Sequence, residues 1–168
     1  MNQFILSAIY LSAIILANLV SAWFGPSASI INAFVLIGLV LSTRDRLHDL
    51  WGGNVKRNML ALIVLGGTVS YLLNRDAGPI ALASMTAFAV SETLDALLYA
   101  ALKRFPFLAR SNVSNLLGAA SDSLIFPTIA FGALLWPIVL GQFAAKVLGG
   151  FLWSLVLNAR AKRTALTA

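Results

Sequence analysis

Long apolar runs separated by short basic stretches are the feature that most constrains how this chain can fold. Of the 168 residues, 60% are hydrophobic and 11% are charged, and the mean hydropathy is +0.88. A soluble domain of this length cannot hide so much apolar surface from water. The composition therefore indicates an integral membrane protein.

Six apolar segments are long enough, or nearly so, to cross a bilayer as helices, which takes about 20 mostly apolar residues. They lie near 4–23, 29–43, 58–74, 80–102, 112–134 and 136–158. The second can lengthen through Arg44 to Trp51 at the membrane surface, and Pro127 predicts a kink in the fifth. A tight turn at Pro137 separates the last two. The predicted fold is all-α: one transmembrane domain, 1–168, with six spans and a basic cytoplasmic tail at 159–168.

Basic residues gather on one side of this topology. The loops 44–57 and 103–111 and the C-terminal tail carry Arg44, Arg46, Lys56, Arg57, Lys103, Arg104, Arg110, Arg160, Lys162 and Arg163. The opposite side carries Arg75. Lysine and arginine favour cytoplasmic loops, so we expect a multi-pass protein of the cell (inner) membrane with both termini in the cytoplasm. The net charge of +6 then reflects topology and does not predict a nucleic-acid partner.

Several chemistries lack the residues they need. The chain has no cysteine, which excludes disulfides and thiolate metal sites. Its single histidine, His48, is too few for a histidine-based metal site. No phosphate-binding glycine loop is present, so nucleotide hydrolysis by that route is not expected. We predict no metal, no cofactor and no enzymatic activity.

Four ionisable residues lie inside the predicted spans: Glu92, Asp95, Asp122 and Lys146. A central Asp or Lys costs roughly 2.5–3.5 kcal/mol on insertion scales. We therefore expect all four to face the interior of the bundle and one another.

Helical spacing places each of these charges on a polar face of its span, at about 100° per residue. The fourth span offers Ser84, Phe88, Ser91, Glu92, Asp95 and Tyr99; the fifth Ser111, Asn115, Gly118 and Asp122, bordered by Ser114 and Phe126; the sixth Gln142, Lys146 and Gly150, with Trp153 close by. The residues predicted to bind substrate are Ser91, Glu92, Asp95, Asn115, Asp122, Phe126, Gln142 and Lys146.

A purely structural role for these residues stays open. Small and polar residues in transmembrane helices often serve only close packing, and Asp122 with Lys146 can form an ion pair that fixes helix register. Three carboxylates facing one ammonium, however, leave two acids to be protonated or used by a ligand.

Three segments of the sequence resemble the queuosine precursor transporter family, also called the vitamin-uptake-transporter family. They are ASMTAFAVSETLDALLYAALKR, SNVSNLLGAASDSLIFPTIAF and GQFAAKVLGG. The family's positions fall on Ser91, Asp95, Ser114, Gly118, Asp122, Phe126 and Lys146. TRDRLHDLWG at 43–52 is similar to the family's stretch after the second span, although Arg44 shifts the first acid, Asp45, by one position. The resemblance covers roughly residues 30–155.

The resemblance implies import of a 7-deazaguanine, such as preQ0, preQ1 or queuine, for tRNA modification. It also implies a six-helix organisation like that of the substrate-binding subunits of energy-coupling-factor transporters. The chemistry is compatible: a carboxylate can accept the adjacent N–H donors of the base, Gln142 or Lys146 can donate to its carbonyl, and an aromatic ring can stack on it. Phe126, Tyr99 and Trp153 are the candidate rings.

Other functions stay open beside this one. They are a proton- or ion-coupled carrier or vitamin-binding subunit for another small polar solute, a membrane enzyme that uses Lys146, and a scaffold with a structural charge cluster. The basic stretch 43–57 can lie on membrane lipid or dock on an ATPase-linked coupling partner. Assembly of the chain into a homo-oligomer is a further alternative.

Overall fold

The computed structural model describes residues 2–105 and 107–166; within these ranges it leaves out the side chains of 95–96, 99–100, 107–112, 114–115 and 158–166. The part of the chain that it describes consists of helices and short connections, without a strand. This confirms the all-α class expected from the sequence.

Helices follow one another with short connections. The elements in order are α1 (Gln3–Phe24), the 3₁₀ turn η1 (Gly25–Ala28), α2 (Ser29–Asn32), the π-helical turn η2 (Ala33–Ile37), α3 (Gly38–Trp51), the 3₁₀ turn η3 (Gly52–Asn54), α4 (Val55–Leu73), α5 (Ala77–Ala101), α6 (Phe107–Phe131) and α7 (Trp136–Leu166). Gly25 and Gly52 end α1 and α3 with φ of 60° and 51°, a conformation that glycine adopts without a steric penalty.

The helices lie over the segments predicted as spans. α1, α4, α5, α6 and α7 each cover one of them, and α2, η2 and α3 together cover the second and continue to Trp51. α7 runs on to Leu166, so the segment predicted as a tail is helical as far as that residue. Pro127 lies inside α6.

By length and composition, two stretches of the described chain can cross a membrane, Gln3–Leu73 and Trp136–Leu157, and Leu116–Phe131 is a shorter apolar helix. The first stretch runs through α1, α2, α3 and α4. The count of six spans stays a prediction.

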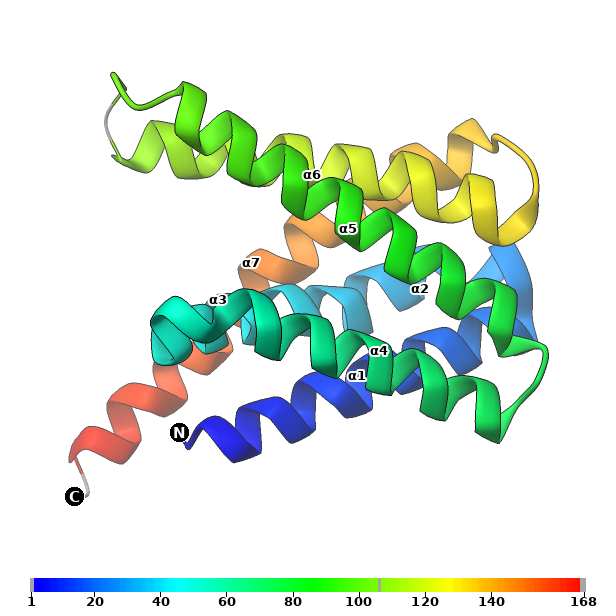
Figure 1. Cartoon of the computed structure of the whole chain (residues 1–168), viewed down its shortest axis with the longest axis horizontal. Coiled ribbons are helices and arrows are strands. Elements are labelled where there is room, and N and C mark those ends of the chain that lie inside the picture. Colours follow the sequence, from blue (N-terminus) through cyan, green and yellow to red (C-terminus); the bar gives the residue numbers. More distant parts are fainter. Residues whose placement is uncertain (1, 106, 167–168) are drawn as a thin grey trace.

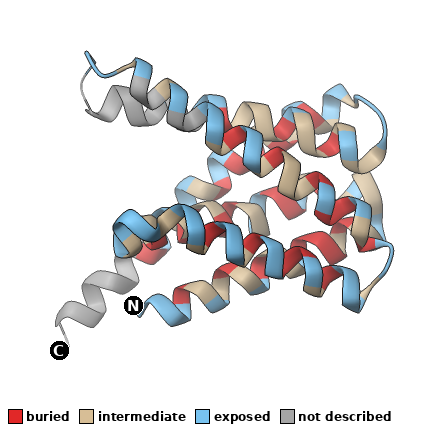
Figure 2. Cartoon of the chain, in the orientation of Figure 1, coloured by how far each residue is buried: buried red, intermediate tan, exposed pale blue. Residues whose placement is uncertain are grey.

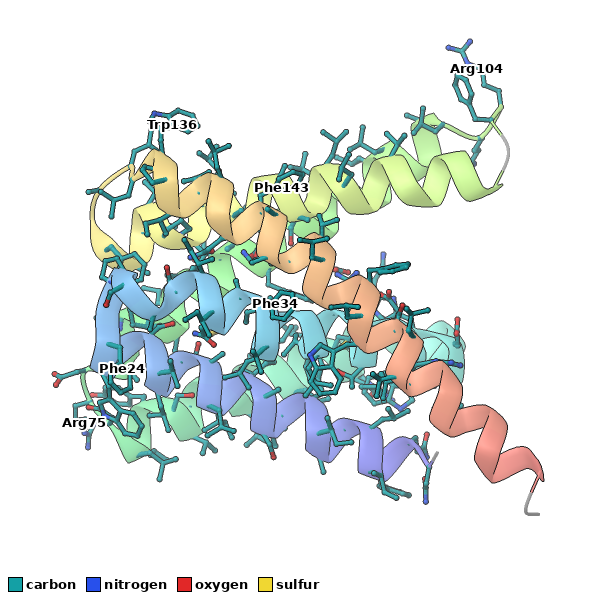
Figure 3. The ribbon with its side chains drawn as sticks, turned by 180° about the vertical axis from the view of Figure 1, so that it is seen from behind. Phe24, Phe34, Arg75, Arg104, Trp136 and Phe143 are labelled. Carbon is teal, nitrogen blue, oxygen red and sulfur yellow. The ribbon has the colours of Figure 1, made fainter. Side chains whose placement is uncertain are left out.

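The long helices run back and forth between two ends of the molecule (Figure 1). The start of α1, the end of α7 and the α3–α4 and α5–α6 connections lie at one end, and the remaining connections lie at the other. Figure 3 shows Arg104 at the first end and Arg75, Phe24 and Trp136 at the second. The arrangement thus separates Arg75 from Arg104, as the sequence predicts.

Apolar side chains occupy both the interior and the outer faces. Leu6, Tyr10, Val40, Met59 and Ile63 belong to a buried cluster between α1, α3 and α4. Large apolar side chains are also exposed along the outer faces of the helices, among them Leu60, Leu72, Leu82, Leu140 and Leu148, and Figure 2 shows buried residues where helices face one another. Outer faces of this kind suit lipid, because soluble monomers rarely expose such large apolar patches.

Glycines let α3 and α7 touch. A Cβ added at Gly38 would lie 2.6 Å from the carbonyl carbon of Gly149, so a side chain there would push the helices apart. The Ser42 hydroxyl donates to the Gly150 carbonyl at 2.8 Å. This contact holds the part of α3 that carries Arg44 against the part of α7 that carries Lys146.

Candidate substrate-binding cavity

A cavity of about 590 Å³ lies between the helices. Every long helix contributes to its wall, which is mostly apolar with a few polar and charged side chains. Pockets of about 300–1,000 Å³ with this kind of wall commonly hold small-molecule ligands.

Six of the eight residues predicted to bind substrate line this cavity. They are Ser91 and Glu92 from α5, Asp122 and Phe126 from α6, and Gln142 and Lys146 from α7. Ser84, Phe88, Gly118 and Gly150, from the same predicted faces, line it as well. The side chains of Asp95 and Asn115 lie outside the described residues. The three polar faces therefore meet at one place, while their role in binding stays a prediction.

Lys146 is the most enclosed charge in the cavity. Its side chain is 3% exposed, and its Nζ donates to Asp122 Oδ2 at 2.5 Å and to Gln142 Oε1 at 3.2 Å. Gln142 lies one helical turn before Lys146 on α7, which brings its amide oxygen to the ammonium. The ion pair that the sequence left open as an alternative is thus present in this structure.

Arg44 supplies a second cation, which the sequence counts with the basic residues of the loop 44–57. The helix does continue through Arg44 to Trp51, as the sequence allows, but Arg44 faces the cavity and not the membrane surface. Arg44 Nη1 donates to the Glu92 carboxylate, and its Nε and Nη2 donate to Asp45 Oδ1 at 3.2 and 3.1 Å. Glu92 therefore pairs with Arg44, and three carboxylates face two cations in the described wall.

A network of uncharged side chains from the N-terminal half was also missed. Asn32 Nδ2 donates to the Ala17 carbonyl and the Ser21 hydroxyl at 2.9 and 2.8 Å. Asn18 Nδ2 donates to Ser70 Oγ at 3.2 Å, and Ser84 Oγ donates to Asn18 Oδ1 at 3.0 Å.

A signal for this network was present in the sequence. Tyr10, Ala17 and Ser21 all line the cavity, and their spacing of seven and then four residues keeps them on one face of a helix. An asparagine within a long apolar run, such as Asn18, is a further sign of an inward-facing position.

One of the three candidate aromatic rings lines the cavity. Phe126 does so, and it packs edge-to-face on Phe131 with ring centroids 6.0 Å apart. The indole of Trp153 instead donates to the Val35 carbonyl at 2.9 Å. The Tyr99 side chain lies outside the described residues.

His48 lies on α3 beyond the predicted second span. Partial burial lowers its pKa from the ordinary value, and the positive charge of Arg44 lowers it further. Across the described residues, no cluster of three or more His, Cys, Asp or Glu side chains is placed to hold a metal ion.

An all-helical chain with apolar outer faces around a polar cavity of this size has the features of a membrane protein that binds a small molecule. The family described as "Putative vitamin uptake transporter" matches residues 3–158, and the chain belongs to this family. The match confirms the resemblance to the vitamin-uptake-transporter family and makes the chain a membrane transporter for a small molecule. No curated protein and no solved structure matches it.

Proposed function

We propose that this transporter imports a queuosine precursor, a 7-deazaguanine such as preQ0, preQ1 or queuine, for tRNA modification. The observation that carries the proposal is the Lys146–Asp122–Gln142 cluster in the cavity wall, with Phe126 on the same wall. These residues combine a carboxylate, two kinds of N–H donor and an aromatic ring, which are the groups that a guanine-like base requires.

Asp122 can bind a base while it keeps its ion pair. Only one of its oxygens accepts from Lys146, and a carboxylate has about four acceptor positions. Asp122 therefore takes the adjacent N–H donors of the base, Gln142 Nε2 or Lys146 donates to the carbonyl, and Phe126 stacks on the ring. Ser91, Glu92, Asp95 and Asn115 complete the proposed binding set.

The proposed topology has six transmembrane spans with both termini in the cytoplasm. It is supported by the back-and-forth course of the helices and by the position of Arg104 and Arg75 at opposite ends (Figures 1 and 3). A six-helix organisation resembles the substrate-binding subunits of energy-coupling-factor transporters. The proposal keeps two further alternatives: an ATPase-linked partner that drives uptake, and assembly into a homo-oligomer.

Binding to the purified protein is the direct test. Wild-type protein in detergent should bind preQ0, and Asp122→Ala should abolish that binding. Asp76→Ala is the matched control, because Asp76 is an exposed residue before α5 and lies outside the cavity wall. Undiminished binding by Asp122→Ala would refute the assigned role of this carboxylate.

Uptake is tested in cells that cannot make preQ0. Expression of the transporter with external preQ0 should restore queuosine in tRNA, and Asp122→Asn should not. Equal queuosine levels with and without the transporter would refute the proposed substrate.

A second candidate function is a proton-coupled carrier for another small polar solute. It is favoured by the carboxylates of Glu92 and Asp122, which both line the cavity in contact with a cation. Ionisable groups inside a bundle commonly serve as proton relays. Uptake into vesicles with an imposed pH gradient, with unlabelled preQ0 as competitor, separates the two functions.

A further inference from the structure

Charged side chains in the cavity wall are satisfied by one another. Arg44 pairs with Asp45 and Glu92, and Lys146 pairs with Asp122. These five are the charged residues in the described wall. Both cations therefore already have a carboxylate partner. The one surplus negative charge belongs with Asp45, which is 60% exposed and can be hydrated.

Uncharged polar atoms in the same wall are not satisfied. Four buried side-chain polar atoms lack a hydrogen-bond partner within the described part of the chain: Tyr10 OH, Asn32 Oδ1, Ser123 Oγ and Gln142 Nε2. Tyr10, Asn32 and Gln142 line the cavity, and they are only 0%, 6% and 1% exposed. A buried polar group without a partner costs about 1–3 kcal/mol, so three of them in one cavity need an explanation.

Neighbouring hydrogen bonds fix which atom of each amide is free. Asn32 uses its Nδ2 on Ala17 and Ser21, which leaves the carbonyl oxygen to accept. Gln142 uses its Oε1 on Lys146, which leaves the NH₂ group to donate. The wall thus presents one acceptor, one donor and the Tyr10 hydroxyl, which can do either.

We propose that Tyr10, Asn32 and Gln142 are specificity-determining contacts for an uncharged ligand that carries both hydrogen-bond donors and acceptors. The proposal rests on the proposed function in that it concerns the same cavity and narrows its substrate class. A ligand of this class satisfies the three unpaired atoms and leaves both ion pairs intact. A ligand with a net charge finds no unpaired counter-charge among the enclosed groups, because the one surplus carboxylate, Asp45, is 60% exposed, and burying a charge without a close partner is unfavourable.

Tyr10→Phe tests the hydroxyl without a large change in shape. The ring belongs to an apolar cluster that includes Leu6, Leu47 and Met59, so removal of an unpaired hydroxyl should leave the melting temperature unchanged or higher. Loss of one neutral hydrogen bond should weaken preQ0 binding about fivefold. Tyr71→Phe is the matched control, because Tyr71 lies exposed on α4 beside Arg75; its binding should equal wild type.

Two deazaguanines that differ in charge test the ligand class. preQ0 carries a neutral nitrile, whereas preQ1 carries an aminomethyl group that is protonated at neutral pH. We expect preQ0 to bind at least about tenfold more tightly than preQ1, measured by calorimetry on purified protein. The preference should shrink at alkaline pH, where the amine of preQ1 loses its proton.

Failure of this proposal differs from failure of the proposed function. Equal binding of preQ0 and preQ1, or wild-type preQ0 affinity in Tyr10→Phe, overturns the inference and leaves the substrate family standing. If the protein binds neither preQ0 nor preQ1, the proposed substrate is wrong. Nicotinamide and nicotinate then serve as a second pair of a neutral and a charged compound. If nicotinate binds more tightly than nicotinamide, or if neither of these two binds, the inference is overturned as well.

Discussion

The Lys146–Asp122 pair and the Arg44–Glu92 pair line the same cavity but are held differently. The first joins α6 and α7, and Lys146 has Gln142 as an uncharged second partner. The second joins α3 and α5, and Arg44 has a second carboxylate, Asp45, that is 60% exposed.

This difference indicates that the two ion pairs do not open with equal ease. A cation enclosed with one carboxylate has no other charge to bind, so loss of that partner leaves it uncompensated. Arg44 keeps a solvated acidic partner when it leaves Glu92. We therefore expect the Arg44–Glu92 pair to open more readily than the Lys146–Asp122 pair.

Lys146→Met should have the largest effect, because it leaves Asp122 in the cavity without its cation. The expected loss is about 3–5 kcal/mol of the free energy of unfolding, the range for breaking a buried pair. Denaturant unfolding in detergent measures it. The double variant Lys146→Met with Asp122→Asn should recover most of the loss, and no recovery would contradict the role of the pair.

Arg44→Gln should cost less, about 1–2 kcal/mol, because the glutamine amide can still donate to Glu92 and because Arg44, 13% exposed, is less enclosed than Lys146, 3% exposed. The same unfolding measurement applies. Arg57→Gln, on an exposed position of α4, serves as the control and should match wild type. A loss equal to that of Lys146→Met would break the distinction between the two pairs.

Gln142→Glu gives Lys146 two carboxylate partners, as Arg44 has. The new oxygen keeps the contact with Lys146 but adds a charge beside Asp122 where Gln142 is only 1% exposed, so the melting temperature should fall. The loss of the Nε2 donor should weaken preQ0 binding about fivefold. Thermal melting and calorimetry on one preparation measure the two effects, and wild-type preQ0 affinity in this variant would contradict the role of the amide as a contact.

The smallest effect concerns pH at the Arg44 end, where His48 lies. Its pKa is lower in the folded protein than the ordinary value of 6.5, so the unfolded chain binds the proton more tightly and stability must fall as the pH drops below about 6.5. His48→Gln should flatten this part of the profile. Thermal melting between pH 7.5 and pH 5 provides the measurement, and an unchanged slope in the variant would assign it to other groups.

Much of the charged part of the cavity wall could be predicted from the helical spacing of polar residues. Ser91, Glu92, Asp122, Phe126, Gln142 and Lys146 were chosen by spacing, and all six line the cavity. They could be found because each predicted face carries a charge that is costly in lipid. The cavity-lining faces of α1 and α2 carry no charged residue. Their polar residues are Tyr10, Asn18, Ser21, Ser29 and Asn32, whose small cost in a helix is typical of ordinary packing residues.

Arg44 shows a different limit. Its place in the sequence, just after an apolar run and among other basic residues, is typical of a cytoplasmic loop. Only the continuation of α3 and its contact with α7 at Gly38 and Gly149 turn this side chain toward Glu92. Counting the charges within each predicted span cannot identify an ion-pair partner, such as Arg44, that lies beyond the end of a span.

The sequence by itself determined the helical class, the course of the helices and the inward faces of α5, α6 and α7, because helical periodicity and the cost of burying charge are local properties of the chain. Only the tertiary structure decided which cation meets which carboxylate and which polar atoms stay unpaired. Those outcomes depend on the close approach of α3 to α7 at Gly38 and Gly149 and on the packing of α5 against α1, where Ser84 meets Asn18. Residues far apart in the chain set both, and no local pattern encodes them.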